Sequence, residues 1–298
     1  LHNQSQPGIV DFLARIRALT DSYGGRFSVA EVGGDHAERE MQAFTAGEEH
    51  LNSAYGFLYL YAPALARELV QQSARCWHGR AGQGWPSWSF SNHDAPRAVS
   101  RWAEGRDLKA FAGMAMLLLL TLRGNAFIYQ GEELALPQGE VPFDRLVDPE
   151  AIANWPLTLG RDGARTPLPW AADQAHAGFS TVEPWLPLDP RHVGLAVDRQ
   201  ERDPQSMLRL TRRLVAFRKA HPALIRGGMT LVDVGGGLLA FERVCGSERL
   251  LCVFNLGHVS APWMMPSGHR VIEAVNLDGS PENPLPPLAG LVLAGTAG

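Results

Sequence analysis

Two ionisable side chains stand next to each other in residues 90–94, whose sequence is Phe-Ser-Asn-His-Asp. Residues 86–90 predict a short buried strand, so the imidazole of His93 and the carboxylate of Asp94 would follow its C-terminal end. In a parallel α/β barrel catalytic groups collect at this end, because the strands fix them while the loops shape a pocket. A His-Asp pair also caps many ordinary loops, and that structural role is the alternative.

A second carboxylate, Glu31, lies near the end of another apolar run, residues 26–32, just before two glycines. If the two runs are alternating strands of one barrel, Glu31 and Asp94 point into the same mouth. Two carboxylates in different surroundings can divide the work of proton transfer and charge stabilisation. The alternatives are a solvated loop acid for Glu31 and a helix or loop cap for Asp94.

The elements that must hold these residues alternate between strand and helix patterns. Strands are predicted at residues 26–32, 52–60, 86–90 and 126–130, and helices at residues 7–23, about 62–78, 107–122 and 205–219. This order is typical of a parallel sheet with crossover helices. Short, apolar strands suit a sheet buried on both faces. Four such units predict half of an eight-stranded barrel, and an independent doubly wound sheet is the alternative.

The remaining sequence has two different textures. Residues 132–204 form a long connection rich in Pro and Trp, which predicts an ordered, functional loop. From about residue 225, short alternating runs separated by turn residues predict an antiparallel β domain. We therefore expect an α/β fold, with the C-terminal half of a (β/α)8 TIM barrel over residues 1–223 and a small antiparallel β-sandwich domain over residues 224–298.

Composition excludes several classes of partner. A net charge of −4 and a pI near 6.2 predict no nucleic acid and no anionic membrane as partner. The longest apolar run, residues 110–122, predicts a fully buried helix, because a bilayer requires roughly 20 apolar residues. Cys76, Cys245 and Cys252 are an odd set with no metal-type spacing, so we expect neither a metal site nor a disulfide framework. For Cys245 and Cys252 we expect two buried free thiols, with their approach across a hairpin as the alternative. With no targeting signal in the first residues, we expect a cytoplasmic location.

Four segments together resemble the alpha-amylase superfamily of glycoside hydrolases, and within it the alpha-glucosidase and oligo-1,6-glucosidase branch. They are Ala-Glu-Val-Gly-Gly-Asp at residues 30–35, the Phe-Ser-Asn-His-Asp segment at 90–94, Phe-Ile-Tyr-Gln-Gly-Glu-Glu at 127–133, and Gly-Arg-Asp-Gly-Ala-Arg-Thr-Pro-Leu-Pro-Trp at 160–170. They occur in the family's order, and the β domain agrees with it as well. The resemblance therefore covers essentially the whole chain.

The resemblance implies a role for each matching residue. Glu31 corresponds to the general acid/base, a job that requires a carboxyl whose pKa is raised by burial. Asp94 corresponds to the carboxylate that holds the sugar hydroxyls and stabilises the positively charged transition state, and His93 would donate to the same sugar. Arg161 corresponds to an arginine that fixes the non-reducing glucose, with a structural ion pair as the alternative.

Further residues of these segments have more local expected roles. Arg165 is expected to order the loop around Trp170, and residues 130–133 to close the rim of the barrel. Phe57 and Trp170 are candidates for an apolar wall of the substrate pocket, although either could be plain core.

One departure from the family pattern matters for the chemistry. A retaining glycosidase needs a nucleophilic carboxylate about 5–5.5 Å from the acid. The family carries it in a Gly-Phe-Arg-x-Asp motif, which this sequence lacks. We therefore expect the nucleophile in a missing N-terminal half of the same polypeptide, which becomes a required partner. Any cation site is expected there too, and no cofactor is expected within this segment. We also expect half a barrel to be unstable and inactive alone.

The function implied is a retaining, exo-acting alpha-glucosidase that releases terminal glucose from short oligosaccharides or glucosides, with transglucosylation as a side reaction. A sucrose hydrolase or isomerase is the nearest alternative. A non-catalytic, glucosidase-like subunit associated with a transporter is the alternative from another class. Linkage preference and oligomeric state do not follow from the sequence.

Overall fold

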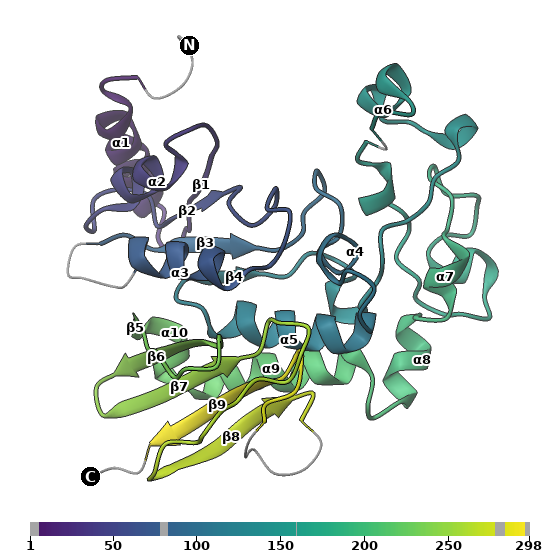
Figure 1. Cartoon of the computed structure of the whole chain (residues 1–298). Coiled ribbons are helices and arrows are strands. Elements are labelled where there is room, and N and C mark those ends of the chain that lie inside the picture. Colours follow the sequence, from purple (N-terminus) through teal and green to yellow (C-terminus); the bar gives the residue numbers. More distant parts are fainter. Residues whose placement is uncertain (1–5, 78–82, 159, 278–283, 296–298) are drawn as a thin grey trace.

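A parallel and an antiparallel sheet, with two long helices between them, form the computed structural model of this chain (Figure 1). The structure describes residues 6–77, 83–158, 160–277 and 284–295. The parallel sheet has the order β1-β2-β3-β4, and its strands are β1 (Val29–Val32), β2 (Ser53–Gly56), β3 (Pro86–Ser89) and β4 (Asn125–Phe127). Each strand thus pairs with the next one in sequence, as short strand-helix-strand connections favour.

One helix of this part precedes the first strand, and the others follow strands. They are α1 (Ile9–Asp21), α2 (Ala37–Thr45), α3 (Arg67–Cys76), α4 (Ala98–Trp102), α5 (Leu108–Thr121), α9 (Met207–Ala220) and α10 (Pro222–Arg226). The four predicted strands and the four predicted helices are confirmed, although each strand is shorter than its apolar run and residue 78 lies outside the described residues. The sequence analysis missed α2, whose charged residues leave few apolar positions in its short pattern.

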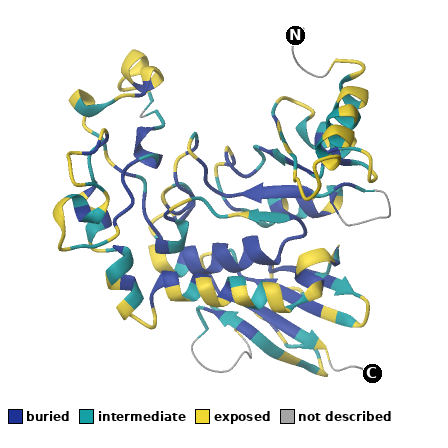
Figure 2. Cartoon of the chain, turned by 180° about the vertical axis from the view of Figure 1, so that it is seen from behind, coloured by how far each residue is buried: buried dark blue, intermediate teal, exposed yellow. Residues whose placement is uncertain are grey.

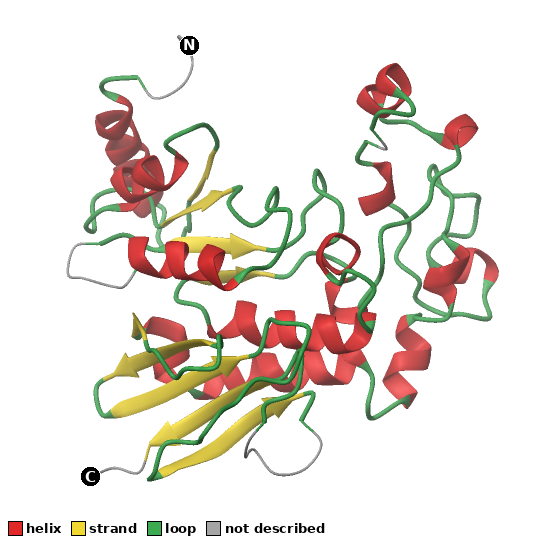
Figure 3. Ribbon diagram, in the orientation of Figure 1, coloured by secondary structure: helices red, strands yellow, loops and turns green. Residues whose placement is uncertain are grey.

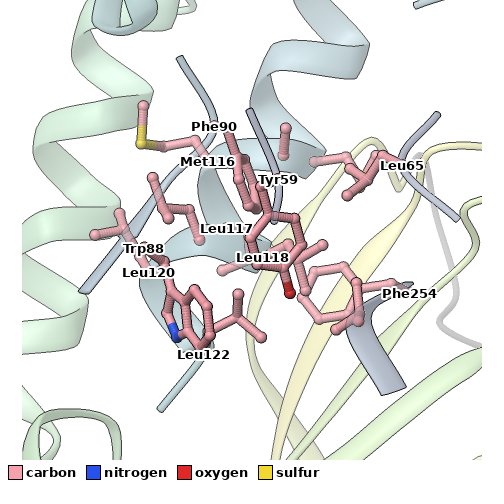
Figure 4. Packing of buried hydrophobic residues seen from close by; sticks show 14 of the residues in the cluster. Tyr59, Leu65, Trp88, Phe90, Met116, Leu117, Leu118, Leu120, Leu122 and Phe254 are labelled. Carbon is pink, nitrogen blue, oxygen red and sulfur yellow. The ribbon is translucent and has the colours of Figure 1, made fainter. Parts of the chain in front are cut away.

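Helix α5 is the centre of the core. Asp107 caps its N-terminus by accepting a hydrogen bond from the Ala110 amide at 2.7 Å, and every residue from Phe111 to Thr121 is buried. Its apolar side chains meet Trp88 of β3 on one side and Phe254 of β7 on the other (Figure 4). The prediction of a fully buried helix is confirmed, because α5 lies between two sheets (Figure 2).

The long segment between β4 and α9 is ordered, with short helices joined by loops (Figure 3). It contains the 3₁₀ turns η1 (Glu132–Leu134), η2 (Phe143–Arg145), η3 (Asp162–Ala164) and η4 (Ala175–Gly178), and the helices α6 (Pro149–Asn154), α7 (Pro190–Val193) and α8 (Val197–Arg202). Backbone hydrogen bonds hold most of these turns, and side chains cap two of the helices. Asp148 caps α6, and Asp189 caps α7.

The antiparallel domain is one sheet rather than a sandwich. Among the described residues its strands have the order β5-β6-β7-β9-β8, with β5 (Gly228–Leu231), β6 (Leu239–Cys245), β7 (Glu248–Phe254), β8 (His269–Val275) and β9 (Gly290–Gly295). One face packs against α5, and the other is covered by loop residues such as Trp263 and Leu285. These loops bury the apolar face where we expected a second sheet. The three cysteines are free thiols, as expected for Cys245 and Cys252, although only Cys252 of these two is buried.

The parallel sheet keeps two edges within the described residues, because β1 and β4 each pair with one neighbour only. Large apolar side chains lie exposed at these edges: Phe27 is 62% exposed, Val29 39% and Phe127 38%. The half-barrel arrangement stays a prediction. Within the described part of the chain, no helix has the length and apolarity needed to cross a membrane.

Candidate active site

The predicted acid and the predicted histidine line the same hollow at the C-terminal ends of the parallel strands. Glu31 is paired in register with Tyr55 of β2, and His93 follows β3. The hollow has a volume of about 330 Å³, and its lining also includes Asn92 and, from the β4 end, Phe127 and Tyr129. We expected alternating strands to aim Glu31 and Asp94 into one mouth. Asp94 follows His93 directly but is not among the residues that line this hollow, so that expectation stays a prediction.

Asn92 holds the residues of this loop in place. Its side-chain oxygen accepts hydrogen bonds from the backbone amides of Asp94 (2.9 Å) and Ala95 (2.7 Å), which fixes a tight turn. Its amide group donates to the Tyr55 hydroxyl at 2.8 Å. Burial raises the pKa of Tyr55 to about 12, so this hydroxyl keeps its proton and can donate it to a bound oxygen. From the sequence we expected no specific role for Asn92 or Tyr55, although an Asn side chain commonly bonds the backbone two residues further along the chain.

Two arginines and a histidine surround the Asp94 carboxylate. The Arg165 guanidinium donates to its Oδ1 at 2.8 Å, Nη1 of Arg161 lies 3.6 Å from the same oxygen, and Nε2 of His93 lies 3.5 Å from Oδ2. The carboxylate is one third exposed, so part of it still faces solvent. Such a group can accept hydrogen bonds from sugar hydroxyls and offer negative charge to a cationic transition state.

Arg165 has contacts beyond the loop that we expected it to order, and that ordering role stays a prediction. Its guanidinium donates to the His93 carbonyl at 2.8 Å as well as to Asp94, and it therefore belongs to the site. Trp170 is half exposed, and its backbone amide bonds the Ala177 carbonyl. The family resemblance implied a role for Arg165 near Trp170. The chain turns through η3 between Arg161 and Arg165 and directs both guanidinium groups toward Asp94.

Arg161 makes the ion pair that we had considered as an alternative to sugar contact. Its guanidinium binds the Asp148 carboxylate through two hydrogen bonds, at 2.7 and 3.0 Å. The Asp148 side chain has no exposed surface, whereas Arg161 is one third exposed. An arginine held this way can still reach a ligand from its free edge, so contact with sugar stays a prediction.

The exposure of Glu31 and the position of Phe57 bear on two further expectations. Glu31 is exposed, so the described residues do not supply the burial that we expected around the acid. Phe57 lines a neighbouring hollow with Gly33 and Tyr61 and touches the Glu31 hollow only through the Tyr55 ring, whose centroid is 5.7 Å away. Its role as a substrate wall stays a prediction.

Residues 130–133 follow Tyr129, which lines the hollow, and their expected role in closing the rim of the barrel stays a prediction. The Glu132 carboxylate accepts a hydrogen bond from the Tyr129 amide at 2.9 Å, and its burial raises its pKa to about 7. The buried Arg97 donates to the carbonyls of Gln130 at 2.6 Å and Ala164 at 3.2 Å. These bonds tie β4, the loop after β3 and η3 together. Among the described residues no cluster of His, Cys, Asp and Glu could hold a metal ion.

Comparisons with known proteins identify the family. Residues 1–227 match the model of the alpha-amylase catalytic domain. The chain belongs to the alpha-amylase family. The match to this alpha-amylase model ends directly before β5 begins at Gly228.

Relatives within the alpha-amylase family are named glucosidases. The chain is 41% identical over 268 residues to a probable alpha-glucosidase of Rhizobium meliloti strain 1021, an alignment that covers 89% of this chain and 48% of the relative. It is 27% identical to a probable oligo-1,6-glucosidase 2 of Bacillus subtilis strain 168, over 87% of this chain and 52% of that protein. The chain thus spans about half the length of these curated relatives.

Solved structures agree with the barrel fold of this family. The crystal structure of the alpha-glucosyl transfer enzyme XgtA matches with a TM-score of 0.86 and 35% identity, over 97% of this chain and 55% of that one. The trehalulose synthase MutB from Pseudomonas mesoacidophila MX-45 matches with a TM-score of 0.83, 97% and 59% coverage and 22% identity, and this likeness concerns the fold alone.

Proposed function

We propose that this chain carries the acid/base part of the active site of a retaining, exo-acting alpha-glucosidase that releases terminal glucose from short oligosaccharides or glucosides. The single observation that carries the proposal is that Glu31 and His93 line one hollow, beside an Asp94 that Arg165 holds at 2.8 Å. The relatives named alpha-glucosidase and oligo-1,6-glucosidase support it.

The proposed reaction uses Glu31 twice. A nucleophilic carboxylate forms a bond to the anomeric carbon while the bond from that carbon to the leaving oxygen breaks, and Glu31 gives its proton to this oxygen. Water then attacks the glucosyl-enzyme, gives its proton back to Glu31 and displaces the carboxylate. Asp94 holds the sugar hydroxyls and stabilises the positive charge, His93 donates to the same sugar, and Arg161 adds a contact from its free edge. An alcohol in place of water gives transglucosylation.

We further propose that the nucleophile comes from polypeptide outside this chain, where any cation site would also lie. The absence of the Gly-Phe-Arg-x-Asp motif, the unpaired edges of β1 and β4, and relatives of about twice this length support this. Strands added at these edges would cover the exposed Phe27 and Phe127 and bring further groups around Glu31. Division of the chain into residues 1–223 and 224–298 is part of the same proposal.

The test is hydrolysis of p-nitrophenyl alpha-glucoside and maltose by the intact protein, with the anomeric configuration of the released glucose followed by NMR. We expect retained configuration, and Glu31→Gln and Asp94→Asn should each lower kcat/KM by several orders of magnitude on maltose. Because p-nitrophenolate leaves without protonation, Glu31→Gln should lose far less on the nitrophenyl substrate, whereas Asp94→Asn should lose similarly on both. Glu140→Gln, an exposed carboxylate paired with Arg191, is the control.

Two outcomes would replace the proposal. Activity on sucrose alone would favour the sucrose hydrolase or isomerase, whose acid and charge-stabilising residues would be the same. An intact protein that is inert on all three substrates would favour the non-catalytic, transporter-associated subunit.

A further inference from the structure

We propose that Asp148 is a positioning residue for the reaction: it holds Arg161 at a set distance from Asp94 and so preserves the negative charge of Asp94 for the substrate. This inference rests on the proposed function, because Asp94 is the group that meets the sugar. No sequence expectation pointed to Asp148, which lies in the long segment between β4 and α9.

The Asp148 carboxylate is completely enclosed and fully bonded. Oδ1 accepts from Nη2 of Arg161 at 2.7 Å and from the Glu150 amide at 3.2 Å. Oδ2 accepts from Nε and from the backbone amide of Arg161, at 3.0 and 2.8 Å. Side chain and backbone of Arg161 are therefore both fixed by one carboxylate, which leaves the guanidinium little freedom.

The backbone around Asp148 is fixed in turn from two sides. The buried Asp162 accepts from the amides of Val147 at 2.7 Å and Asp148 at 2.9 Å through one oxygen. Gly160 has a φ of +61°, and a Cβ there would lie 2.7 Å from Oδ2 of Asp148 and 2.4 Å from the Cβ of Ala151. Only glycine permits this close approach, so the loop before Arg161 is built around the Asp148 carboxylate.

The charges in this network balance. Asp94 meets two arginines, Arg165 at 2.8 Å and Arg161 at 3.6 Å, while Arg161 is shared with Asp148. The hydrogen bonds from Arg161 hold the pKa of Asp148 well below its usual range, so Asp148 keeps its charge throughout the neutral range. Without that charge Arg161 would be free to close the 3.6 Å gap and bind Asp94 fully. Asp94 would then face the sugar with two strong cationic partners and little remaining charge.

A near twin of this motif, elsewhere in the long segment, supplies the control. Asp189 also caps a short helix that begins with proline, is nearly enclosed, and binds Arg191 through hydrogen bonds of 2.6 and 3.0 Å. Although burial alone would raise the pKa of Asp189, the bonds from Arg191 and backbone amides lower it below its usual range. Its arginine continues to the exposed Glu140 at 2.8 Å rather than to Asp94.

The experiment compares Asp148→Asn with Asp189→Asn in the intact protein. For each variant we would measure the thermal midpoint, kcat and KM on p-nitrophenyl alpha-glucoside, and the dissociation constants of 1-deoxynojirimycin, a cationic sugar mimic, and of neutral glucose. Both variants should lower the thermal midpoint by similar amounts. Only Asp148→Asn should lower kcat, about tenfold with KM within about twofold, and weaken 1-deoxynojirimycin about tenfold while glucose changes much less.

Equal losses of kcat in the two variants, or equal weakening of the cationic and the neutral ligand, would overturn the positioning role, because both results describe general loss of structure. Unchanged kcat in Asp148→Asn would overturn it as well. If wild type is inert on glucosides, the proposed function fails separately, and selective weakening of 1-deoxynojirimycin still supports the role of Asp148. A wild-type protein that binds neither ligand overturns both proposals.

Discussion

Arginines serve two different purposes at the two ends of this molecule. At the mouth of the parallel sheet, Arg161 and Arg165 donate to carboxylates and remain partly exposed. At the junction with the antiparallel sheet, Arg243 is completely buried and donates to backbone carbonyls, those of Thr121, Leu224, Gly227 and Gly228, at 2.5 to 3.2 Å. Nearby Arg218 and Arg123 likewise donate to carbonyls.

The difference lies in what the guanidinium satisfies. The last carbonyls of α5 have no partner within the helix, and cations near a helix C-terminus are favoured by its dipole. In the described part of the chain no carboxylate pairs with Arg243, so its charge is balanced by carbonyl dipoles, and burial lowers its pKa to about 9. At the mouth each arginine instead sets the charge and direction of a carboxylate. The carbonyl-bound arginines stabilise the fold, for example where Arg243 of β6 donates to the end of α5. The carboxylate-bound arginines set the charge and orientation of Asp94.

The largest effect that separates the two groups should come from Arg243→Met. This change keeps most of the apolar volume but removes a donor from three buried carbonyls, those of Thr121, Leu224 and Gly227, and from the half-buried one of Gly228. The free energy of unfolding should therefore fall by about 3–4 kcal/mol. Urea unfolding of the intact protein measures it, together with kcat/KM per folded molecule. If activity per folded molecule falls as much as stability, the division between structural and chemical arginines is wrong.

Arg165→Lys should show the opposite profile. A lysine is a point charge and cannot hold both the Asp94 carboxylate and the His93 carbonyl, so Asp94 loses its orientation. We expect kcat/KM on maltose to fall about 100-fold, equivalent to about 2.7 kcal/mol, while the free energy of unfolding changes by less than about 1 kcal/mol. A stability loss like that of Arg243→Met, with unchanged kinetics, would contradict this.

Much of this arrangement follows from local sequence. Apolar runs and caps predicted the four parallel strands, the buried α5 and the antiparallel strands, and strand ends placed Glu31, His93 and Asp94 near one another. The strand and helix patterns depend on residues close in sequence, and the parallel pairing of successive strands brings their C-terminal ends to one edge of the sheet.

What the sequence could not provide depends on distant partners. Asp148 and Arg161 are 13 residues apart, and Arg165 and Asp94 are 71 apart, in a segment with little regular structure. The buried position of Arg243 could not be predicted either, because arginine is normally an exposed residue and the carbonyl partners of Arg243 come from three separate elements. The covering of the antiparallel sheet by loops, rather than by a second sheet, likewise depends on how residues far apart pack.

Arg97 combines features of the carbonyl-bound and the carboxylate-bound arginines. It is buried and donates to backbone carbonyls, but it also lies near the Glu132 carboxyl. The pKa of Glu132 is about 7 in the folded protein and near 4.5 in a free chain, so between these values the folded state binds more protons. Stability from this group is present below about pH 4.5 and is lost as the pH rises through 7.

Glu132→Gln should remove this dependence. Wild type should lose about 1–3 kcal/mol of unfolding free energy between pH 5 and pH 8 through Glu132, and the variant should show a flatter profile. Urea unfolding at several pH values is the measurement, with Glu133→Gln as the control, since the neighbouring Glu133 carboxylate also accepts a backbone hydrogen bond, from the Gly131 amide at 2.7 Å. A variant with the wild-type slope would mean that Arg97 neutralises Glu132 as fully as a carboxylate-bound arginine would.

The smallest effect is expected for an arginine that belongs to neither group. Arg249 pairs with Glu242 across β6 and β7 at 3.4 Å, and its side chain is 65% exposed. Water and salt screen such a pair, so Arg249→Ala should change the free energy of unfolding by less than about 0.5 kcal/mol and leave kcat/KM unchanged. Urea unfolding at low and at high salt tests this. A larger loss of unfolding free energy in Arg249→Ala would mean that every arginine contact stabilises the fold. A negligible loss would mean that the stabilisation comes from arginines such as Arg243, which donate to buried carbonyls.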